Sequence, residues 1–252
     1  MTFFRAEGLS IRFGGIQALA GVTFEVRQGE VLTIIGPNGA GKTTIFNLIS
    51  RLYEPSEGRL IYRDLDITRV APHRIARLGI ARTFQNNELF EHASVLANLL
   101  LGRHAHRAAT LLEEMLFLPR VRRGERVHRE RVEEIIDLLD LQRYRDAIVM
   151  SLPFGVRKVV ELGRALASEP ALLLLDEPSS GLNVEETDDM AFWIQDLRCL
   201  RGITILMVEH DMRLVSQVSD RVIALNDGQV IAEGTPAEVQ RHAGVVKAYL
   251  GG

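Results

Sequence analysis

Residues 30–44 read EVLTIIGPNGAGKTT, an apolar run that leads into a glycine-rich turn and a lysine. The run up to Ile35 is apolar and β-branched, which is typical of a strand buried on both faces. The turn from Gly36 to Thr44 fits the pattern G-x-x-x-x-G-K-[ST], in which backbone N–H groups surround phosphate oxygens. This stretch therefore predicts an α/β fold with a phosphate-binding loop, or P-loop, at the end of a buried strand.

Each residue type in this loop has a chemical reason to be there. Glycines 36, 39 and 41 let the backbone curl, and a helix that begins near Lys42 points its positive N-terminal end at the phosphates. Lys42 supplies a charge for the β- and γ-phosphates, and the hydroxyl of Thr43 is the expected ligand of Mg²⁺. The complete set of loop residues predicted to bind nucleotide is Gly36, Pro37, Asn38, Gly39, Ala40, Gly41, Lys42, Thr43 and Thr44.

Two more apolar runs end in residues that can complete the chemistry. The run ALLLLDEP ends in Asp176 and Glu177, at the carboxyl edge where parallel sheets bind their ligands. We expect Asp176 to hold Mg²⁺, directly or through water, and Glu177 to polarise an attacking water. The run ITILMVEHD carries His210, which we expect at the same edge, where it can contact the γ-phosphate and orient that water.

The order of patterns along the chain predicts the architecture. Short alternating segments near the N-terminus favour an antiparallel sheet, and the later alternation of strands with helices favours a parallel sheet covered by helices. Residues 98–141 contain no strand pattern and are typical of helices, so a helical insertion interrupts the α/β core. A further hairpin is expected to turn at Asn226, Asp227 and Gly228.

Composition narrows the class of protein. The chain has 252 residues, 46% of them apolar and 25% charged, with a net charge of −3 that does not favour nucleic acid. The one cysteine, Cys199, excludes an internal disulfide and fits a reducing compartment. Neither a secretory signal nor an apolar run of about 20 residues is present, so we expect a cytoplasmic protein that spans no membrane.

On these motifs and their order, the chain resembles the ATP-binding subunits of ABC transporters over essentially its whole length. The resemblance implies ATP and Mg²⁺ as cofactors, and a P-loop NTPase fold with a RecA-like core and a mostly parallel sheet. It also implies that Phe13 stacks on adenine, and that Gln85 in ARTFQN is the Q-loop glutamine, which senses the γ-phosphate and contributes to Mg²⁺ binding. Residues 179–183, SSGLN, resemble the D-loop, with Asn183 where the family usually has aspartate.

This fold is expected as a single domain, 1–252, with internal parts. Residues 1–84 and 160–252 form the nucleotide-binding core, which includes the N-terminal antiparallel β subdomain. Residues 85–159 form an inserted α-helical subdomain that carries the Q-loop and the family's signature segment.

The signature segment departs from the family pattern. SLPFGVRK, residues 151–158, aligns with LSGGQ through Leu152–Val156, but only Leu152 and Gly155 match. Pro153 replaces the serine, and a proline is tolerated in the first turn of a helix. The resemblance implies that Leu152 and Gly155 act in trans, on the nucleotide of a partner subunit.

A narrower resemblance, to the branched-chain amino acid uptake subfamily, rests on FGGIQAL, GIARTFQNNELF, EHDM and AYLGG. It implies an importer that contains a second ATP-binding subunit, identical or different, and two transmembrane permease subunits. A periplasmic or extracellular solute-binding protein acts indirectly, and no nucleic acid is involved. The chain would lie peripherally on the cytoplasmic face of the bacterial inner membrane. Residues near the groove for the permease would be Phe84, Asn86, Asn87, Leu89 and Phe90.

Other functions remain open on the sequence. An ABC-type ATPase could serve urea, amide or lipopolysaccharide-type systems, or act outside transport. A P-loop kinase has no use for the 151–158 segment, and a sensor that only holds ATP does not need Glu177. Separately, residues 119–132, PRVRRGERVHRERV, hold six arginines against two glutamates. This stretch is either a site for an anionic membrane surface or acidic partner, or a solvated helix face.

Overall fold

A computed structural model describes residues 2–83, 89–106 and 119–250 of the chain. It divides into two compact units, one formed by residues 1–75 and 171–252 and the other by residues 76–170. We call the first the nucleotide unit and the second the helical unit. The predicted helical insertion, 85–159, falls inside the second unit.

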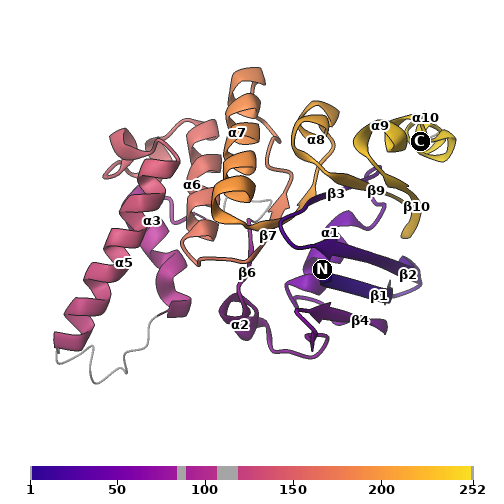
Figure 1. The fold of residues 1–252 in the computed structure, drawn as a ribbon, viewed down its shortest axis with the longest axis horizontal. Helices are drawn as coiled ribbons and strands as arrows, with labels where there is room; N and C mark the ends of the chain where they lie inside the picture. The colour runs from indigo at the N-terminus through magenta and orange to yellow at the C-terminus, as the bar shows by residue number, and fades with distance from the viewer. Residues whose placement is uncertain (1, 84–88, 107–118, 251–252) are drawn as a thin grey trace. The chain divides into compact units, whose positions relative to one another are not determined.

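The nucleotide unit contains an antiparallel sheet built mainly from its N-terminal residues. Strands β1 (Thr2–Phe13) and β2 (Ile16–Arg27) pair along most of their length, and β4 (Glu57–Tyr62) and β5 (Leu65–Asp66) extend the sheet in the order β2-β1-β4-β5. The expected short strands are therefore parts of two longer ones. Figure 1 shows this sheet close to the N-terminus.

A second, mostly parallel sheet carries the predicted motifs. Within the nucleotide unit its order is β10-β9-β3-β8-β7, formed by β3 (Val31–Ile35), β7 (Leu172–Asp176), β8 (Thr204–Val208), β9 (Arg221–Asn226) and β10 (Gln229–Gly234). Strand β3 pairs in parallel with β8 and β9, and β7 pairs in parallel with β8. Every residue of β3, β7 and β8 is buried, as their continuous apolar runs predict.

Helices connect and cover these strands. They are α1 (Lys42–Ile49), α2 (Pro72–Ile75), α7 (Val184–Arg201), α8 (Met212–Val218), α9 (Pro236–Arg241) and α10 (Ala243–Leu250). Helices α7, α8, α9 and α10 lie on one side of the large sheet in Figure 1. The predicted hairpin is confirmed, because β9 and β10 pair in antiparallel fashion around Asp227 and Gly228, both with positive φ.

In the described residues of the helical unit, three helices form the main body. They are α3 (Val95–Gly102), α5 (Pro119–Leu138) and α6 (Phe154–Leu166), with a short strand β6 (Ile80–Arg82) and single helical turns beside them. Helix α3 contacts both α5 and α6. Gly163 of α6 allows this approach, since an added Cβ would lie 3.1 Å from Leu139 and 3.3 Å from Leu99.

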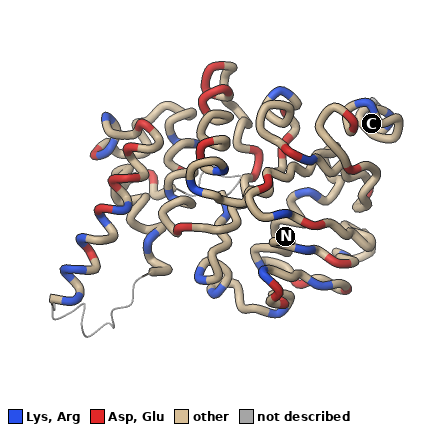
Figure 2. Tube along the Cα trace, viewed as in Figure 1, with Lys and Arg blue, Asp and Glu red and all other residues tan. Residues whose placement is uncertain are grey.

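Helix α5 has an apolar half and a charged half. Val132, Ile135 and Ile136 are buried, whereas the arginines of its N-terminal half are exposed. Figure 2 shows this half of α5 as a row of basic positions with few acidic ones between them. Among the residues that the structure describes, no helix is both long enough and apolar enough to cross a membrane.

Candidate nucleotide-binding site

The P-loop has the backbone conformation that its glycines permit. Gly36, Gly39 and Gly41 have φ values of 153°, 84° and 103°, which L-residues with side chains rarely adopt. An added Cβ at Gly36 would lie 2.3 Å from the carbonyl oxygen of Leu225. Strand β9 therefore packs so closely against the loop that only glycine fits at its first position.

Helix α1 begins at Lys42, as predicted, directly after the loop. Asn38 and Gly39 form the exposed tip, whereas Pro37 is half-buried and Ala40 is buried. The carbonyl of Ala40 accepts a hydrogen bond of 3.1 Å from the N–H of Gly228. The β9–β10 hairpin thus holds the inner side of the loop in place.

Lys42 is buried, with 7% of its surface exposed. Its ammonium donates to the carbonyl oxygens of Gly36 at 2.6 Å and Pro37 at 3.0 Å, both within the loop. Burial lowers the pKa of Lys42, and the charges of Glu177 and Asp176 partly oppose that shift. The carboxylates at the end of β7 are therefore close enough for their charges to act on the lysine of the P-loop.

Asp176 and Glu177 occupy the carboxyl end of β7. Asp176, its last residue, is buried with 1% exposure, and Glu177 is half-buried. The backbone of Glu177 has φ 48°, an uncommon value for a residue with a side chain, and its N–H donates to the carbonyl of Val208 at 2.9 Å. The chain thus turns sharply at Glu177 and leaves the strand direction there.

His210 lies beside Glu177 at the end of the neighbouring strand. Its Nδ1 is 4.0 Å from Oε1 of Glu177 and 3.7 Å from Oε2 of Glu209. The imidazole is more than half exposed, with 56% of the side chain accessible, so it can reach a ligand. The structure therefore brings together Lys42, Asp176, Glu177 and His210, four residues that the sequence singled out.

The remaining predicted residues of the nucleotide unit are at the surface. Thr43 is exposed and Thr44 half-buried, both in the first turn of α1. The ring of Phe13 is 43% exposed and packs edge-on against Tyr53, with ring centroids 5.0 Å apart. Tyr53 thus extends the aromatic surface of Phe13, a partner that the sequence analysis missed because no motif marks it.

The predicted trans residues belong to the helical unit. Pro153 is the N-cap of α6, so Leu152 precedes the helix and Gly155 lies in its first turn, with both residues buried. Arg157 donates to the carbonyl of Leu152 at 2.9 Å, which fixes the chain just before the helix. Of the residues expected near the permease, Leu89 is buried and Phe90 exposed. Gln85, with Phe84, Asn86 and Asn87, lies outside the described residues.

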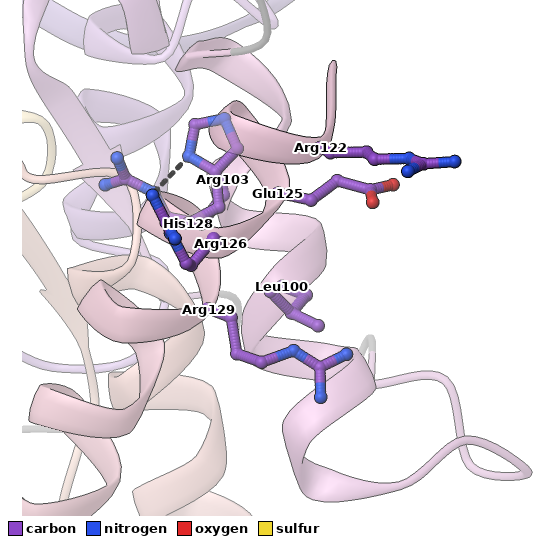
Figure 3. A pocket seen from close by; sticks show the side chains of 7 residues that line it. All are labelled: Leu100, Arg103, Arg122, Glu125, Arg126, His128 and Arg129. Carbon is purple, nitrogen blue, oxygen red and sulfur yellow. Dashed lines mark hydrogen bonds between the residues drawn. The ribbon is translucent and has the colours of Figure 1, made fainter. Parts of the chain in front are cut away.

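A pocket of about 370 Å³ lies in the helical unit, on the arginine-rich half of α5. It is lined by Leu100, Arg103, Arg122, Glu125, Arg126, His128 and Arg129. Arg103 donates to Nδ1 of His128 at 3.3 Å, whereas Arg122 and Arg129 point away from Arg103 in Figure 3. The arginine side chains drawn there do not converge on one point, so the pocket is not arranged around a single anion.

Two residues that the sequence analysis did not select contact the site. Glu209 accepts hydrogen bonds from Ser179, His210 and Asp211, and its position after an apolar strand was a usable signal. Tyr249 of α10 lies near the N–H of Gly36, which lowers the pKa of its phenol while burial raises it more. No sequence pattern predicts the contact between Tyr249 and Gly36.

Among the described residues no cluster of three or more His, Cys, Asp or Glu forms a metal site.

The glycine loop between a buried strand and a helix, with carboxylates at the end of a nearby parallel strand, defines a P-loop nucleotide-binding protein. Comparison with known proteins narrows the class. The family described as ABC transporter matches residues 19–180, and the family described as branched-chain amino acid ATP-binding cassette transporter matches residues 229–252. The chain belongs to the ABC transporter family of ATP-binding cassettes.

Individual relatives agree with this assignment. The high-affinity branched-chain amino acid transport ATP-binding protein BraF of Pseudomonas aeruginosa is 38% identical over 97% of this chain and 96% of its own. An ATP-binding cassette of an ABC transporter, solved in its ADP conformation, has a TM-score of 0.86 at 31% identity and covers 100% of both chains. A cassette solved as a dimer with ADP and Pi has a TM-score of 0.77 at 25% identity, over 92% of this chain and 98% of that one. The predicted fold class is thereby confirmed.

Proposed function

We propose that this chain binds and hydrolyses ATP as the energising subunit of an ABC importer for branched-chain amino acids or a related small solute. The observation that carries the proposal is the position of Glu177 directly after β7, with Nδ1 of His210 4.0 Å from its Oε1, in the same unit as a P-loop whose glycines adopt positive φ. The high-affinity transport function of the BraF relative, over nearly the whole of both chains, supports the choice of substrate.

In this proposal the P-loop holds the phosphates. Its N–H groups and the N-terminus of α1 attract the negative charge, and Lys42 exchanges contacts with loop carbonyls for contacts with phosphate oxygens. A phosphate would also relieve the unfavourable burial of the ammonium, since it supplies the counter-charge that lies next to it. Phe13, with Tyr53 against it, offers its exposed ring to the adenine.

The residues present fit a divalent cation. Asp176 and Glu177 bring two negative charges against one from Lys42, so these side chains have an excess of carboxylate charge that a cation would balance. Thr43, Asp176 and Gln85 would hold Mg²⁺, and the ion would neutralise charge on the phosphates. Glu177, more accessible than Asp176, is then free to take a proton from the attacking water, with His210 placed to orient the γ-phosphate.

The assembly follows from the same assignment. A second ATP-binding subunit, identical or different, would supply its signature segment to this site, and Leu152 and Gly155 of this chain would serve the partner's nucleotide. The dimeric cassette with ADP and Pi supports such pairing. Two permease subunits and a solute-binding protein complete the importer, and this chain would sit peripherally on the cytoplasmic face of the membrane.

The experiment is phosphate release from ATP by the purified chain with Mg²⁺, compared with Glu177→Gln. We expect hydrolysis to fall by about 10²–10⁴-fold in the variant while ATP binding persists, because only the base is lost. Hydrolysis at the unmutated rate would show that another residue is the base. Reconstitution of this chain with candidate permease subunits, with labelled leucine and urea as competing solutes, would identify the substrate.

A further inference from the structure

The carboxylate of Glu209 is the most deeply buried charge near the site. Glu209 directly follows β8, which ends at Val208, and it is 0% exposed. Its own N–H donates to the carbonyl of Ile34 at 3.3 Å, so its backbone is also fixed to the strand that leads into the P-loop.

The two oxygens of this carboxylate bind two different segments. Oε1 accepts from the N–H of Ser179 at 2.8 Å and from its hydroxyl at 2.6 Å. Oε2 accepts from the N–H of His210 at 2.7 Å and from that of Asp211 at 3.0 Å. Ser179 follows Glu177 by two residues in the chain and opens the SSGLN segment, residues 179–183. One side chain therefore joins the segment after Glu177 to the segment that carries His210.

The hydrogen bonds around Glu209 suit a carboxylate but not the amide of a glutamine, which has almost the same shape. Burying a charge is costly unless hydrogen bonds satisfy it, and here four donors surround two acceptor oxygens. A glutamine has the same shape but only one acceptor oxygen, so its NH₂ group would face the two N–H donors of His210 and Asp211, or the N–H and hydroxyl of Ser179. In either orientation at least one backbone N–H loses its acceptor, so Glu209→Gln weakens one of the two connections while it retains most of the packing.

We propose that Glu209 is a positioning residue that couples the SSGLN segment to His210. This proposal rests on the proposed function. A shift of Ser179 changes the hydrogen bonding at Oε1, and the same rigid carboxylate carries that shift to the backbone of His210. The SSGLN segment and the histidine beside Glu177 thus move together, so the segment's position governs whether the histidine is aligned for hydrolysis.

The chain offers a matched control in the same unit. Glu30 is also a buried carboxylate, with 6% exposure, and it accepts from the N–H of Arg27 and from Arg221, both at 2.6 Å. Glu30→Gln removes the same charge by the same change, but Glu30 contacts neither the SSGLN segment nor His210 in the described structure.

The first measurement is steady-state ATP hydrolysis. For Glu209→Gln we expect kcat to fall roughly 10- to 100-fold, the effect of a misplaced group, with KM for ATP unchanged within about threefold. Glu30→Gln should retain the unmutated kcat although its thermal midpoint falls. Equal losses of kcat in both variants, or none in Glu209→Gln, would overturn the proposal.

The second measurement, amide hydrogen exchange, does not depend on activity. This measurement uses Ser179→Ala, which removes only the hydroxyl that donates to Glu209. We expect this variant to fold even if Glu209→Gln does not. We expect faster exchange at residues 210–212 in Ser179→Ala, after the neighbouring strand β8, with unmutated exchange at residues 36–44. Unmutated exchange at 210–212 contradicts the coupling. If the unmutated chain hydrolyses no ATP even with its partner ATP-binding subunit present, the proposed function fails, but this second measurement still decides the role of Glu209.

Discussion

Nδ1 of His210 lies 4.0 Å from Oε1 of Glu177, although the two residues are more than thirty positions apart in the sequence. The register of the sheet explains their meeting. Strands β7 and β8 run in parallel with Asp176 opposite Val208, so the residues that follow each strand emerge at the same edge. This pair therefore depends on the backbone of two buried strands and needs no flexible loop to form.

The first prediction concerns the joint action of this pair. We expect Glu177→Gln and His210→Ala each to lower kcat by at least about 10²-fold, and the double variant to be little worse than the poorer single one. The physical reason is that substitutions of two residues that serve one reaction step do not have additive effects on its activation free energy. A double-mutant cycle on phosphate release tests this, and losses that multiply would show that the two residues act in separate steps.

A second prediction addresses nucleotide binding by Lys42. Lys42→Met keeps the length of the side chain but removes the charge, so ATP affinity should fall by at least about tenfold, since a hydrogen bond to a charged group contributes about 1.5–3 kcal/mol. Lys247→Met, at an exposed position of α10, is the control and should bind ATP as the unmutated chain does. Titration with fluorescent ATP measures the affinity of each variant. Equal affinities of Lys42→Met and the unmutated chain would show that Lys42 does not bind the nucleotide.

The third prediction is a pH dependence of the nucleotide-free protein. Burial holds the pKa of Lys42 below its value in the unfolded chain. Between the two pKa values the unfolded state binds more protons, so Lys42 contributes a free energy of unfolding that rises with pH across that alkaline window. Urea unfolding at a series of alkaline pH values should show this rise in the unmutated chain relative to Lys42→Met. Parallel curves for the two proteins would contradict it.

The sequence was most informative where a motif and a buried strand coincide. The P-loop, Asp176, Glu177 and His210 follow strands whose apolar runs are unmistakable, and parallel pairing brings such strand ends to one edge. The hairpin at Asp227 and Gly228 was predictable for a similar local reason, since its turn residues adopt positive φ.

Contacts between distant segments were not predictable in the same way. Tyr53 against Phe13 and Tyr249 near Gly36 depend on how a loop and the last helix pack, which leaves no periodic signal. Glu209 could have been selected, because it is an acid directly after an apolar strand. The functional role was assigned to the neighbouring His210 instead. The lengths of β1 and β2 were underestimated because glycines inside them resemble strand ends, whereas pairing continues past Gly8 and Gly21 through irregular register.

A fourth prediction concerns Asn183, where the family usually has aspartate. Asn183 is the N-cap of α7. Its side-chain oxygen accepts from the N–H of Glu186 at 3.0 Å, and the carboxylate of Glu186 accepts from the N–H of Asn183 at 2.9 Å. Asn183→Ala should therefore lose about 1 kcal/mol of unfolding free energy. Asn183→Asp should lose none, because aspartate caps equally well and its charge suits a helix N-terminus. Urea denaturation compares the three proteins, and equal losses in both variants would show that capping is not the reason.

The last prediction concerns helix α10 and the strand that precedes the P-loop. Val245 is buried in one apolar cluster with Ile35, the last residue of β3, whereas its neighbour Val246 is 42% exposed. Val245→Ala should lower the free energy of unfolding by about 2 kcal/mol, because it removes buried methyl groups and leaves a small cavity. Val246→Ala makes the same change to the same helix and should stay within about 0.5 kcal/mol of the unmutated chain. Equal effects of the two substitutions would mean that α10 acts through its helix propensity alone. A loss confined to Val245→Ala would establish that the C-terminal helix helps to hold the strand from which the P-loop begins.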